Sequence, residues 1–462
     1  MKNNSSQEEL REEIENNFDT IKNSLAELVE IPGVAWESYD PRDQVKMSKR
    51  VQKHFEVAGL ENVEILSVVH EGGMGKPAIV GEKKAKPGYP TVLLYAHHDV
   101  QPEGDIEVWD TPPFKAIEKN GRLYGRGVAD DKAGIMVHVS AINALTEVLG
   151  KDKVNIGIKV FIEGEEEIGS PTFRKFIDTH KEKLEADAII VADSMNWAAG
   201  KPAVTATLRG MHAAIMELEV MEHAVHSGMY GGPIIDALTC MSKIIASFHD
   251  EKGNVAIEGL LSYDDTEIDM DEKTLRKDSS VLDNIELAGE GTITSRLWTK
   301  PAMSIIGIDA PDVNVSSNTI LPKTRAKYSL RVAPGQDPYE AQKLVEKHVR
   351  KHAPYGTKVT FSNFEYGKPF KSDTEAPHAT ALFESLSESW DTKAVSMGGG
   401  GSIPFTTDLQ DVFPHAEVLC TGVEDPDSRA HSPNESLLLE DFKYAIIAEA
   451  FFLAKLNEKA ND

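Results

Sequence analysis

Cysteine is almost absent from the chain, which has only Cys240 and Cys420 among its 462 residues. The two lie far apart in the sequence, and no C-x-x-C pair occurs. A disulfide-built fold and a cysteine-rich zinc site are therefore excluded. The remaining composition supports a packed core, because 40% of the residues are hydrophobic and 27% are charged.

Positive charge is also scarce, since 49 lysines and arginines stand against 75 aspartates and glutamates, for a formal net charge of −26. Nucleic acids and anionic membrane surfaces are bound through basic faces, so we expect neither as a partner. The sequence has no apolar run long enough to span a membrane, and Met1–Leu25 lacks the apolar core of a signal peptide. These absences predict a cytoplasmic protein, and they fit a bacterial and a eukaryotic cytosol equally well.

Hydrophobic patterning predicts an α/β protein. Apolar residues at three- and four-residue steps predict helices, which cover 7–30, 43–58 and 132–148. Short apolar runs predict buried strands, which lie at 91–96, 156–162 and 188–192. Strands that alternate with helices indicate a mixed, largely parallel sheet flanked by helices.

The alternation of buried strands and helices stops after about residue 205 and resumes near residue 373. The elements predicted in between are strands at 213–220 and 328–332 and helices at 234–248 and 338–352, with loops and short helices over 250–290. The elements predicted after it are a helix at 376–390, a strand at 416–420 and a helix at 440–457. We therefore predict a main domain made of 1–205 and 373–462, with an α+β domain inserted at 206–372.

Histidine, aspartate and glutamate residues follow the predicted strands where they end. His97 and Asp99 come directly after the first strand, and the acidic run 163–167 closes the second. Asp193 follows the third strand, and His431 comes shortly after the fourth. Because α/β sheets bind ligands at the carboxyl ends of their strands, these side chains are candidates for one site. In the H-x-D pattern, the aspartate can also fix the tautomer of a metal-bound histidine.

Each cluster also has a simpler explanation when taken alone. The pair His97 and Asp99 suits a surface contact, and the run 163–167 suits a solvated acidic loop. The segment 125–132 (GRGVADDK) suits a glycine turn with an acidic helix N-cap. It is not a dinucleotide-binding fingerprint, because Asp130 replaces the third glycine, and it is not a P-loop.

Taken together, the clusters predict a site for two divalent metals. Two imidazoles and several carboxylates suit Zn²⁺, Mn²⁺ or Co²⁺. The carboxylates are too many for one tetrahedral zinc, whereas a pair of metals about 3.5–4 Å apart would use them, one as a bridge. No H-E-x-x-H segment occurs, which disfavours a single-zinc site of the thermolysin kind.

At these motifs the chain resembles the co-catalytic zinc metallopeptidases, which include carnosinase, acetylornithine deacetylase, succinyl-diaminopimelate desuccinylase and carboxypeptidase G. The shared segments follow the family's order and span residues 95–435. They are YAHHDVQP (95–102), GRGVADDK (125–132), EGEEEIGS (163–170), the strand ending in Asp193, HSGMYGG (226–232), GGSIP (400–404) and AHSPNE (430–435). The resemblance implies a zinc-peptidase-like α/β catalytic domain with an inserted α+β lid and dimerisation domain.

The resemblance also implies which residues hold the metals. His97 and Asp193 would hold one ion, and Glu167 and His431 the other, while Asp130 would bridge the two. Zn²⁺ is the metal that the family implies first, with Mn²⁺ or Co²⁺ as alternatives.

Catalytic roles are implied in the same way. Glu166 would be the general base that takes a proton from a water bridging the metals, and Asp99 would orient His97. His226, in the inserted domain, would reach the partner subunit's active site and stabilise the tetrahedral oxyanion, so a homodimer through this domain is expected. The family further implies a cis peptide bond between Asp130 and Asp131.

Substrate contacts are implied at the inserted domain and at the glycine run. Arg331 would bind the terminal carboxylate of the substrate through its guanidinium fork. Gly401 and Ser402 would add contacts to that carboxylate, and Thr319 is a weaker candidate beside it. The alternatives are a flexible loop for the glycine run and a surface histidine at a strand end for His226.

We therefore expect a dipeptidase that releases a C-terminal amino acid from short peptides. At position 193 the chain has aspartate where other members of the family carry glutamate, and in this it resembles the dipeptidases and aminotripeptidases. The segment YAHHDVQP resembles that of the carnosinase branch. An N-acyl-amino-acid deacylase or desuccinylase on the same scaffold stays open. Two other functions are disfavoured. An inactive binding homologue would have lost a metal ligand or the base, and all of these residues are present. A two-metal phosphoesterase would have no use for the motifs that contain His226 and Arg331. Two departures from the family pattern are Ala96, where glycine is common, and Ala133-Gly134, where glycine often comes first.

Overall fold

The computed structural model describes residues 2–401 and 403–458. The chain divides into two compact units. Unit 1 is drawn from Met1–Ala206, Ser372–Ser396 and Asp408–Asp462, and unit 2 from Thr207–Lys371 and Met397–Thr407. The glycine run thus groups with unit 2 rather than with the C-terminal part of unit 1. That 206–372 folds as a domain of its own stays a prediction.

A mixed sheet with a parallel centre organises unit 1. Its central strands pair in parallel in the order β8 (Gly157–Glu163), β5 (Thr91–His97), β9 (Ala188–Val191) and β19 (Glu417–Cys420). Antiparallel strands flank them, with β4 (Ala78–Lys83) and β1 (Glu61–Leu66) beyond β8 and β10 (Ala203–Leu208) beyond β19. The expected mixed, largely parallel sheet is confirmed.

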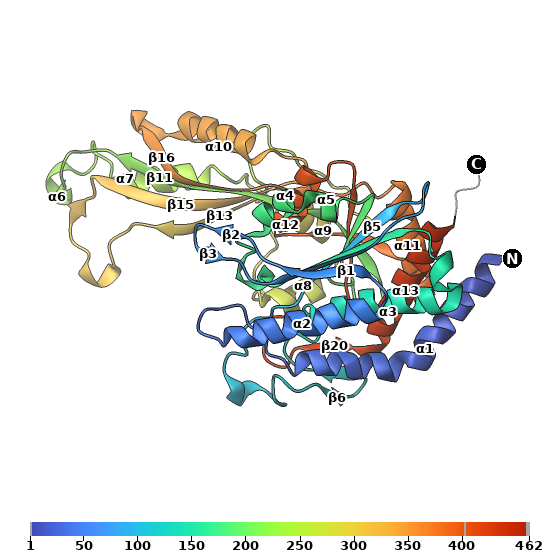
Figure 1. Cartoon of the computed structure of the whole chain (residues 1–462). Coiled ribbons are helices and arrows are strands. Elements are labelled where there is room, and N and C mark those ends of the chain that lie inside the picture. Colours follow the sequence, from blue (N-terminus) through green and yellow to red (C-terminus); the bar gives the residue numbers. More distant parts are fainter. Residues whose placement is uncertain (1, 402, 459–462) are drawn as a thin grey trace. The chain divides into compact units, whose positions relative to one another are not determined.

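Helices cover this sheet on both sides. The helices of one face are α1 (Lys2–Val29), α2 (Pro41–Val57), α3 (Lys132–Leu149) and α13 (Leu439–Asn457), with α11 (Pro377–Trp390) packed against α13 (Figure 1). The short helices α4 (Phe173–Thr179) and α5 (Lys181–Leu184) follow β8, and α5 contacts that strand. Every helix predicted for residues 1–205 and 373–462 is present, with its ends shifted by a few residues.

Alternating side chains along β5 explain this layering. Val92 and Leu94 are fully buried in the core that the long helices share. Tyr95 points to the other face, where its ring centroid lies 5.6 Å from that of Phe161 and 6.1 Å from that of Phe173. A strand buried on both faces has a continuous apolar sequence, which is why the sequence alone predicts it.

Unit 2 is built on an antiparallel sheet with the strand order β13, β15, β11, β16. These strands are β13 (Ala302–Ile308), β15 (Lys323–Val332), β11 (Gly210–Glu219) and β16 (Val359–Gly367), and α7 (Ala237–Ala246) and α10 (Pro338–His352) pack on them. The expected α+β composition is confirmed, but β13 and β16 were not predicted. β16 is mostly exposed and lacks the continuous apolar run of a buried strand, whereas β13 (AMSIIGI) has an apolar sequence that the prediction overlooked.

The predicted strand at 328–332 is too short. β15 begins at Lys323, and its first half carries lysine and arginine side chains that alternate with buried residues. The segment 250–290 contains α8 (Glu272–Ser279) between loops, as expected. No helix within the described residues combines the length and the apolar character needed to cross a membrane.

The remaining elements are short. Those of unit 1 are β2 (Val69–His70), β3 (Gly73–Met74), β6 (Ile117–Lys119), β7 (Arg122–Tyr124) and β20 (Ser436–Leu438). Those of unit 2 are β12 (Val225–His226), α6 (Ser227–Tyr230), α9 (Ile293–Trp298), β14 (Thr319–Ile320) and β17 (Phe370–Lys371). β18 (Val395–Gly399) and α12 (Pro404–Val412) lie where the chain passes between the units.

Candidate metal centre

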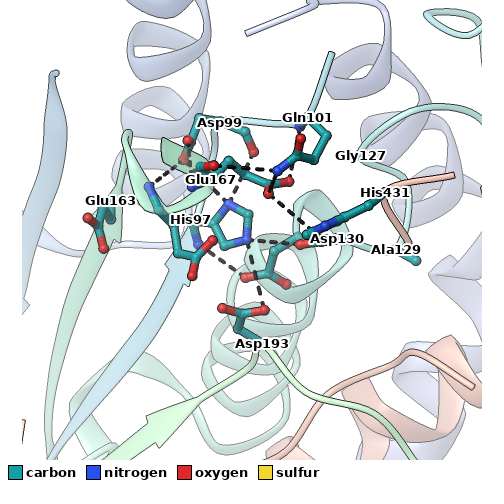
Figure 2. A network of polar contacts seen from close by, with 12 residues as sticks. His97, Asp99, Gln101, Gly127, Ala129, Asp130, Glu163, Glu167, Asp193 and His431 are labelled. Atoms are coloured by element: carbon teal, nitrogen blue, oxygen red, sulfur yellow. Dashed lines mark hydrogen bonds and ion pairs between the residues drawn. The ribbon is translucent and has the colours of Figure 1, made fainter. Parts of the chain in front are cut away.

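The five predicted metal ligands come together at the carboxyl ends of the parallel strands of unit 1 (Figure 2). His97 ends β5, Asp193 follows β9, and Glu167 lies in the turn after β8. Asp130 precedes α3, and His431 lies in the loop between β19 and β20. Parallel pairing brings these positions to one edge of the sheet, as the sequence predicts.

Asp130 lies between the two histidines. Its Oδ1 is 3.0 Å from His97 Nε2, and its Oδ2 is 2.9 Å from His431 Nε2. Asp193 Oδ1 lies 3.9 Å from His97 Nε2, and Glu167 Oε2 lies 3.2 Å from His431 Nε2. The donor atoms therefore form two groups that share Asp130, and within each group they lie within 4.8 Å of one another. The two groups contain the same residues as the two predicted ligand sets. That they bind metal stays a prediction.

This donor set fits two divalent cations. Imidazole nitrogens and carboxylate oxygens suit Zn²⁺, Mn²⁺ and Co²⁺, and Asp130 offers one oxygen to each group, as a bridging carboxylate does. Negative charge is in excess here. Burial, with Asp193 nearby, raises the pKa of Glu166 to about 9, and burial raises the pKa of Asp193 itself to about 7. Bound cations would supply the positive charge that these carboxylates lack.

Neighbouring polar groups hold the ligands in place. The Asp99 carboxylate accepts the backbone N–H of Glu166 at 3.1 Å and that of Glu167 at 3.0 Å. His97 Nδ1 lies 3.1 Å from the backbone oxygen of Asp99 and 3.4 Å from its Oδ1, so the backbone carbonyl is the nearer acceptor. Gln101 donates its side-chain amide to Glu167 Oε2 at 2.7 Å and its backbone N–H to Oε1 at 3.0 Å. Sequence analysis missed Gln101, although it lies inside the motif YAHHDVQP.

Two of the simpler explanations are wrong, and the third holds only in part, because Gly127 does form a glycine turn with a φ angle of +76°. His97 and Asp99 are fully buried instead of lying on the surface. Glu163 and Glu165, in the acidic run, are each only 3% exposed, so the run is not a solvated loop. Asp131 precedes α3, but its side chain caps no helix N–H. Its Oδ2 instead accepts the backbone N–H of His97 at 3.1 Å.

The turn before α3 has the expected backbone, since the peptide bond between Asp130 and Asp131 is cis. Gly134 packs directly against this turn. A Cβ atom at Gly134 would lie 2.2 Å from Asp131 Oδ1 and 2.7 Å from the backbone oxygen of Ala192. The close packing gives a physical reason for the glycine that follows Ala133.

Unit 2 carries the predicted oxyanion residue. His226 and Thr319 are register partners in the β12–β14 pair, and both are exposed. His226 Nδ1 accepts the backbone N–H of Gly228 at 3.0 Å. In the single chain, His226 thus lies at the exposed end of a strand, and its catalytic role stays a prediction.

The predicted carboxylate-binding residues also lie in unit 2. Arg331 is half-buried in β15, and burial together with the charge of Arg331 lowers the pKa of a second guanidinium, Arg209, to about 10. Arg209 Nε donates to the backbone oxygen of Gly400 at 3.3 Å, next to Gly401. Ser402 lies outside the described residues. Sequence analysis missed Arg209, because it stands in no motif and only the fold brings it to the glycine run.

Comparisons with known proteins agree on one family. The family model described as "Peptidase family M20/M25/M40" matches residues 93–454. The cysteinylglycine-S-conjugate dipeptidase of Corynebacterium striatum is 37% identical over 380 residues, covering 81% of this chain and 83% of its own. The Cys-Gly metallodipeptidase dug1 of Schizosaccharomyces pombe is 27% identical, covering 94% and 95%. The crystal structure of human carnosine dipeptidase 1 shares the fold, with a TM-score of 0.71, 23% identity and 98% of both chains covered.

The packing at Gly134 predicts a costly substitution. We expect Gly134→Ala to destabilise unit 1 by about 1–3 kcal/mol, because the added methyl group overlaps Asp131 and the backbone of Ala192. Urea unfolding followed by circular dichroism measures the change. Gly307→Ala is the control, since a Cβ there meets only Lys327 Cβ at 4.0 Å. Equal stability of the two variants would contradict the described packing.

Proposed function

The chain belongs to peptidase family M20/M25/M40, and we propose that it hydrolyses dipeptides and other short peptides that end in a free carboxylate. Relatives named as dipeptidases support this substrate class. The observation that carries the proposal is the pair of ligand groups that share Asp130, with Glu166 beside them. A bridged pair of ligand groups beside a carboxylate base suits hydrolysis of an amide by two metals.

Two divalent metals would be held by the described ligands. His97, Asp130 and Asp193 form the first group, and Asp130, Glu167 and His431 form the second. When bound, the metals polarise the scissile carbonyl and lower the pKa of the attacking water toward neutrality. We propose Zn²⁺ as the native metal, with Mn²⁺ or Co²⁺ as alternatives, because the donor set suits all three.

Glu166 is the general base in this proposal. Its carboxylate takes a proton from the attacking water and passes it to the leaving amine. The side chain starts from a fixed backbone, because Asp99 accepts the Glu166 N–H at 3.1 Å.

The terminal carboxylate of the substrate is assigned to unit 2. The guanidinium fork of Arg331 can bind a carboxylate through two parallel hydrogen bonds. No ion pair among the described residues occupies Arg331, and Arg209 adds a second positive charge nearby. Gly401, Ser402 and Thr319 are proposed as further contacts to the same group.

We also propose a homodimer through unit 2, in which His226 of one subunit donates a hydrogen bond to the oxyanion that forms in the other subunit's site. Large apolar side chains are exposed in the segments around β12 and β14. They include Met229 and Val313, at 74% and 86% exposure. An interface at these segments would remove such side chains from water.

The other expectations follow from charge and sequence. With a net charge of −26, no nucleic-acid or membrane partner is proposed. A cytoplasmic location is proposed because the sequence has only two cysteines. The deacylase alternative differs only in the substrate's amine, which is free in a dipeptide and blocked in an N-acyl amino acid. The inactive homologue is less favoured, because it would have lost a ligand or the base, and the sequence retains all five proposed ligands and Glu166.

Hydrolysis assays distinguish these functions. Chelator-stripped protein is supplied with Zn²⁺ or Mn²⁺ and offered Cys-Gly, an S-substituted Cys-Gly and β-Ala-His, beside N-acetyl and N-succinyl amino acids. We expect cleavage of free dipeptides only, and only with metal added. Cleavage of the blocked substrates alone would assign the chain to the deacylases. No cleavage of either kind would contradict the proposed hydrolysis.

Glu166→Gln tests the base. We expect kcat to fall by about 10²–10⁴-fold, because the amide cannot accept the proton, while the metals stay bound. Steady-state kinetics with a dipeptide gives kcat, and elemental analysis of the same preparation gives the metal content as the control. A variant that keeps two metals and near-normal kcat would show that another group is the base.

Mixing two inactive variants tests the action of His226 across the dimer. Glu166→Gln and His226→Ala are each expected to be inactive alone. In a mixed dimer, one site combines Glu166 of one subunit with His226 of the other, so activity should return after the subunits are exchanged. If His226 served its own subunit, both sites of the mixed dimer would lack one residue, and mixing would restore nothing.

A further inference from the structure

A buried carboxylate that the proposed function does not use holds the turn that carries Asp130. Glu435 is fully buried and follows His431 by four positions. Its Oε1 accepts the backbone N–H of Ala129 at 3.0 Å and that of Asp130 at 3.2 Å. Its Oε2 accepts the backbone N–H of Gly127 at 2.9 Å. Three backbone donors of one turn therefore converge on a single side chain.

Arg126 balances the charge of this carboxylate. Its Nη1 lies 2.7 Å from Glu435 Oε2, and both side chains are almost wholly buried. The guanidinium also lies over the Trp109 ring, 5.4 Å from its centroid, and donates to the backbone oxygen of Pro102 at 3.3 Å. A buried ion pair of this kind leaves little freedom to either partner, because breaking it strands a charge away from water.

The same residue anchors the loop that carries His431. The backbone oxygen of Glu435 accepts the N–H of Gly125 at 3.1 Å, and Asn434 Oδ1 accepts the N–H of Asp110 at 2.7 Å. His431 and Asn434 have φ angles of +62° and +63°, in the left-handed region that non-glycine residues seldom adopt. Such a backbone persists only where its surroundings hold it.

We propose that Glu435 is a positioning residue of the metal centre. It joins the turn 127–130 to the loop 431–435, and so it sets the place of Asp130 relative to His431. The two segments are far apart in the sequence, since Asp130 and Glu435 are separated by 305 positions. The proposal rests on the proposed metal site, because it concerns how two ligands of that site are held.

Glu435→Gln removes this function while it keeps the size of the side chain. Both carboxylate oxygens of Glu435 accept hydrogen bonds, one from two backbone donors and the other from Gly127 and Arg126. The amide NH₂ of glutamine has no acceptor on either side and would face donors only. The turn must therefore shift, and Asp130 shifts with it.

The test measures metal affinity together with stability, because a variant that is only less stable would lower the Tm without weakening metal binding. Zn²⁺ dissociation constants of the intact protein are determined by competition with a chromophoric chelator, together with the Tm of the metal-free protein. Asp441→Asn is the matched control. Asp441 is 1% exposed and accepts the N–H of Gly200 at 3.0 Å and that of the Trp390 indole at 2.9 Å, and both donors lie outside the turn 127–130 and the loop 431–435.

We expect Glu435→Gln to bind Zn²⁺ about 10–100-fold more weakly than the wild type, as is typical when a partner of a metal ligand is lost. Asp441→Asn should keep the wild-type constants even though its Tm also falls. Unchanged metal binding in Glu435→Gln would overturn the proposal, as would equal weakening in both variants. If Glu435→Gln does not fold, Glu435→Asp replaces it, because this variant keeps the charge but is one methylene too short to reach the turn. Wild-type protein that binds no metal would instead refute the metal centre itself.

Discussion

Repulsion among buried carboxylates is the constraint on which unit 1 depends. Asp130, Asp193, Glu166 and Glu167 crowd at the end of one sheet. Burial and neighbouring carboxylates raise the pKa of Glu166 and of Asp193, whereas hydrogen bonds with His431 and His97 outweigh burial and lower the pKa of Asp130. Such a cluster costs free energy unless positive charge enters it, which the two histidines supply in part and two cations would complete. The surrounding structure therefore has to hold the carboxylates together more firmly than an ordinary loop does. Asp99 and Gln101 do this through hydrogen bonds to the backbone and side chain of Glu167.

The parallel centre of the sheet makes this crowding possible. Strands that run in one direction end at one edge, so β5, β8, β9 and β19 deliver their following loops to the same place. The register sets His97 opposite Glu163, and the turn after β8 then brings Glu166 and Glu167 toward the histidine. An antiparallel arrangement of these strands would send alternate loops to opposite edges. Fold and chemistry are linked here through strand direction more than through any single contact.

The two units divide the proposed work. Unit 1 holds the charged centre and the base, whereas unit 2 offers cationic and exposed groups that suit an anionic substrate end and a second subunit. Arg209 donates to the glycine run and lies near Arg331, and a bound carboxylate would relieve the repulsion between the two guanidinium groups. The exposed apolar residues around β12 and β14 likewise have an unfavourable contact with water that an interface would remove. Both features would become more favourable in free energy on binding, the first with an anionic ligand and the second with another protein surface.

Much of the fold and most of the site could be predicted from local patterns. The apolar runs of β5, β8 and β9 predict strands buried on both faces, and the candidate ligands follow these runs in short motifs. The exposed strand β16 has no such continuous run, and the apolar run of β13 was overlooked. Gln101, Arg209 and Glu435 could not be assigned either, because their roles lie in hydrogen bonds that depend on which distant segments meet. Asp130 and Glu435 are 305 positions apart, and no spacing rule links them. Residue types and local periodicity select strands, helices and candidate ligands, whereas the pairing register and the packing of remote loops decide which groups hold those ligands in place.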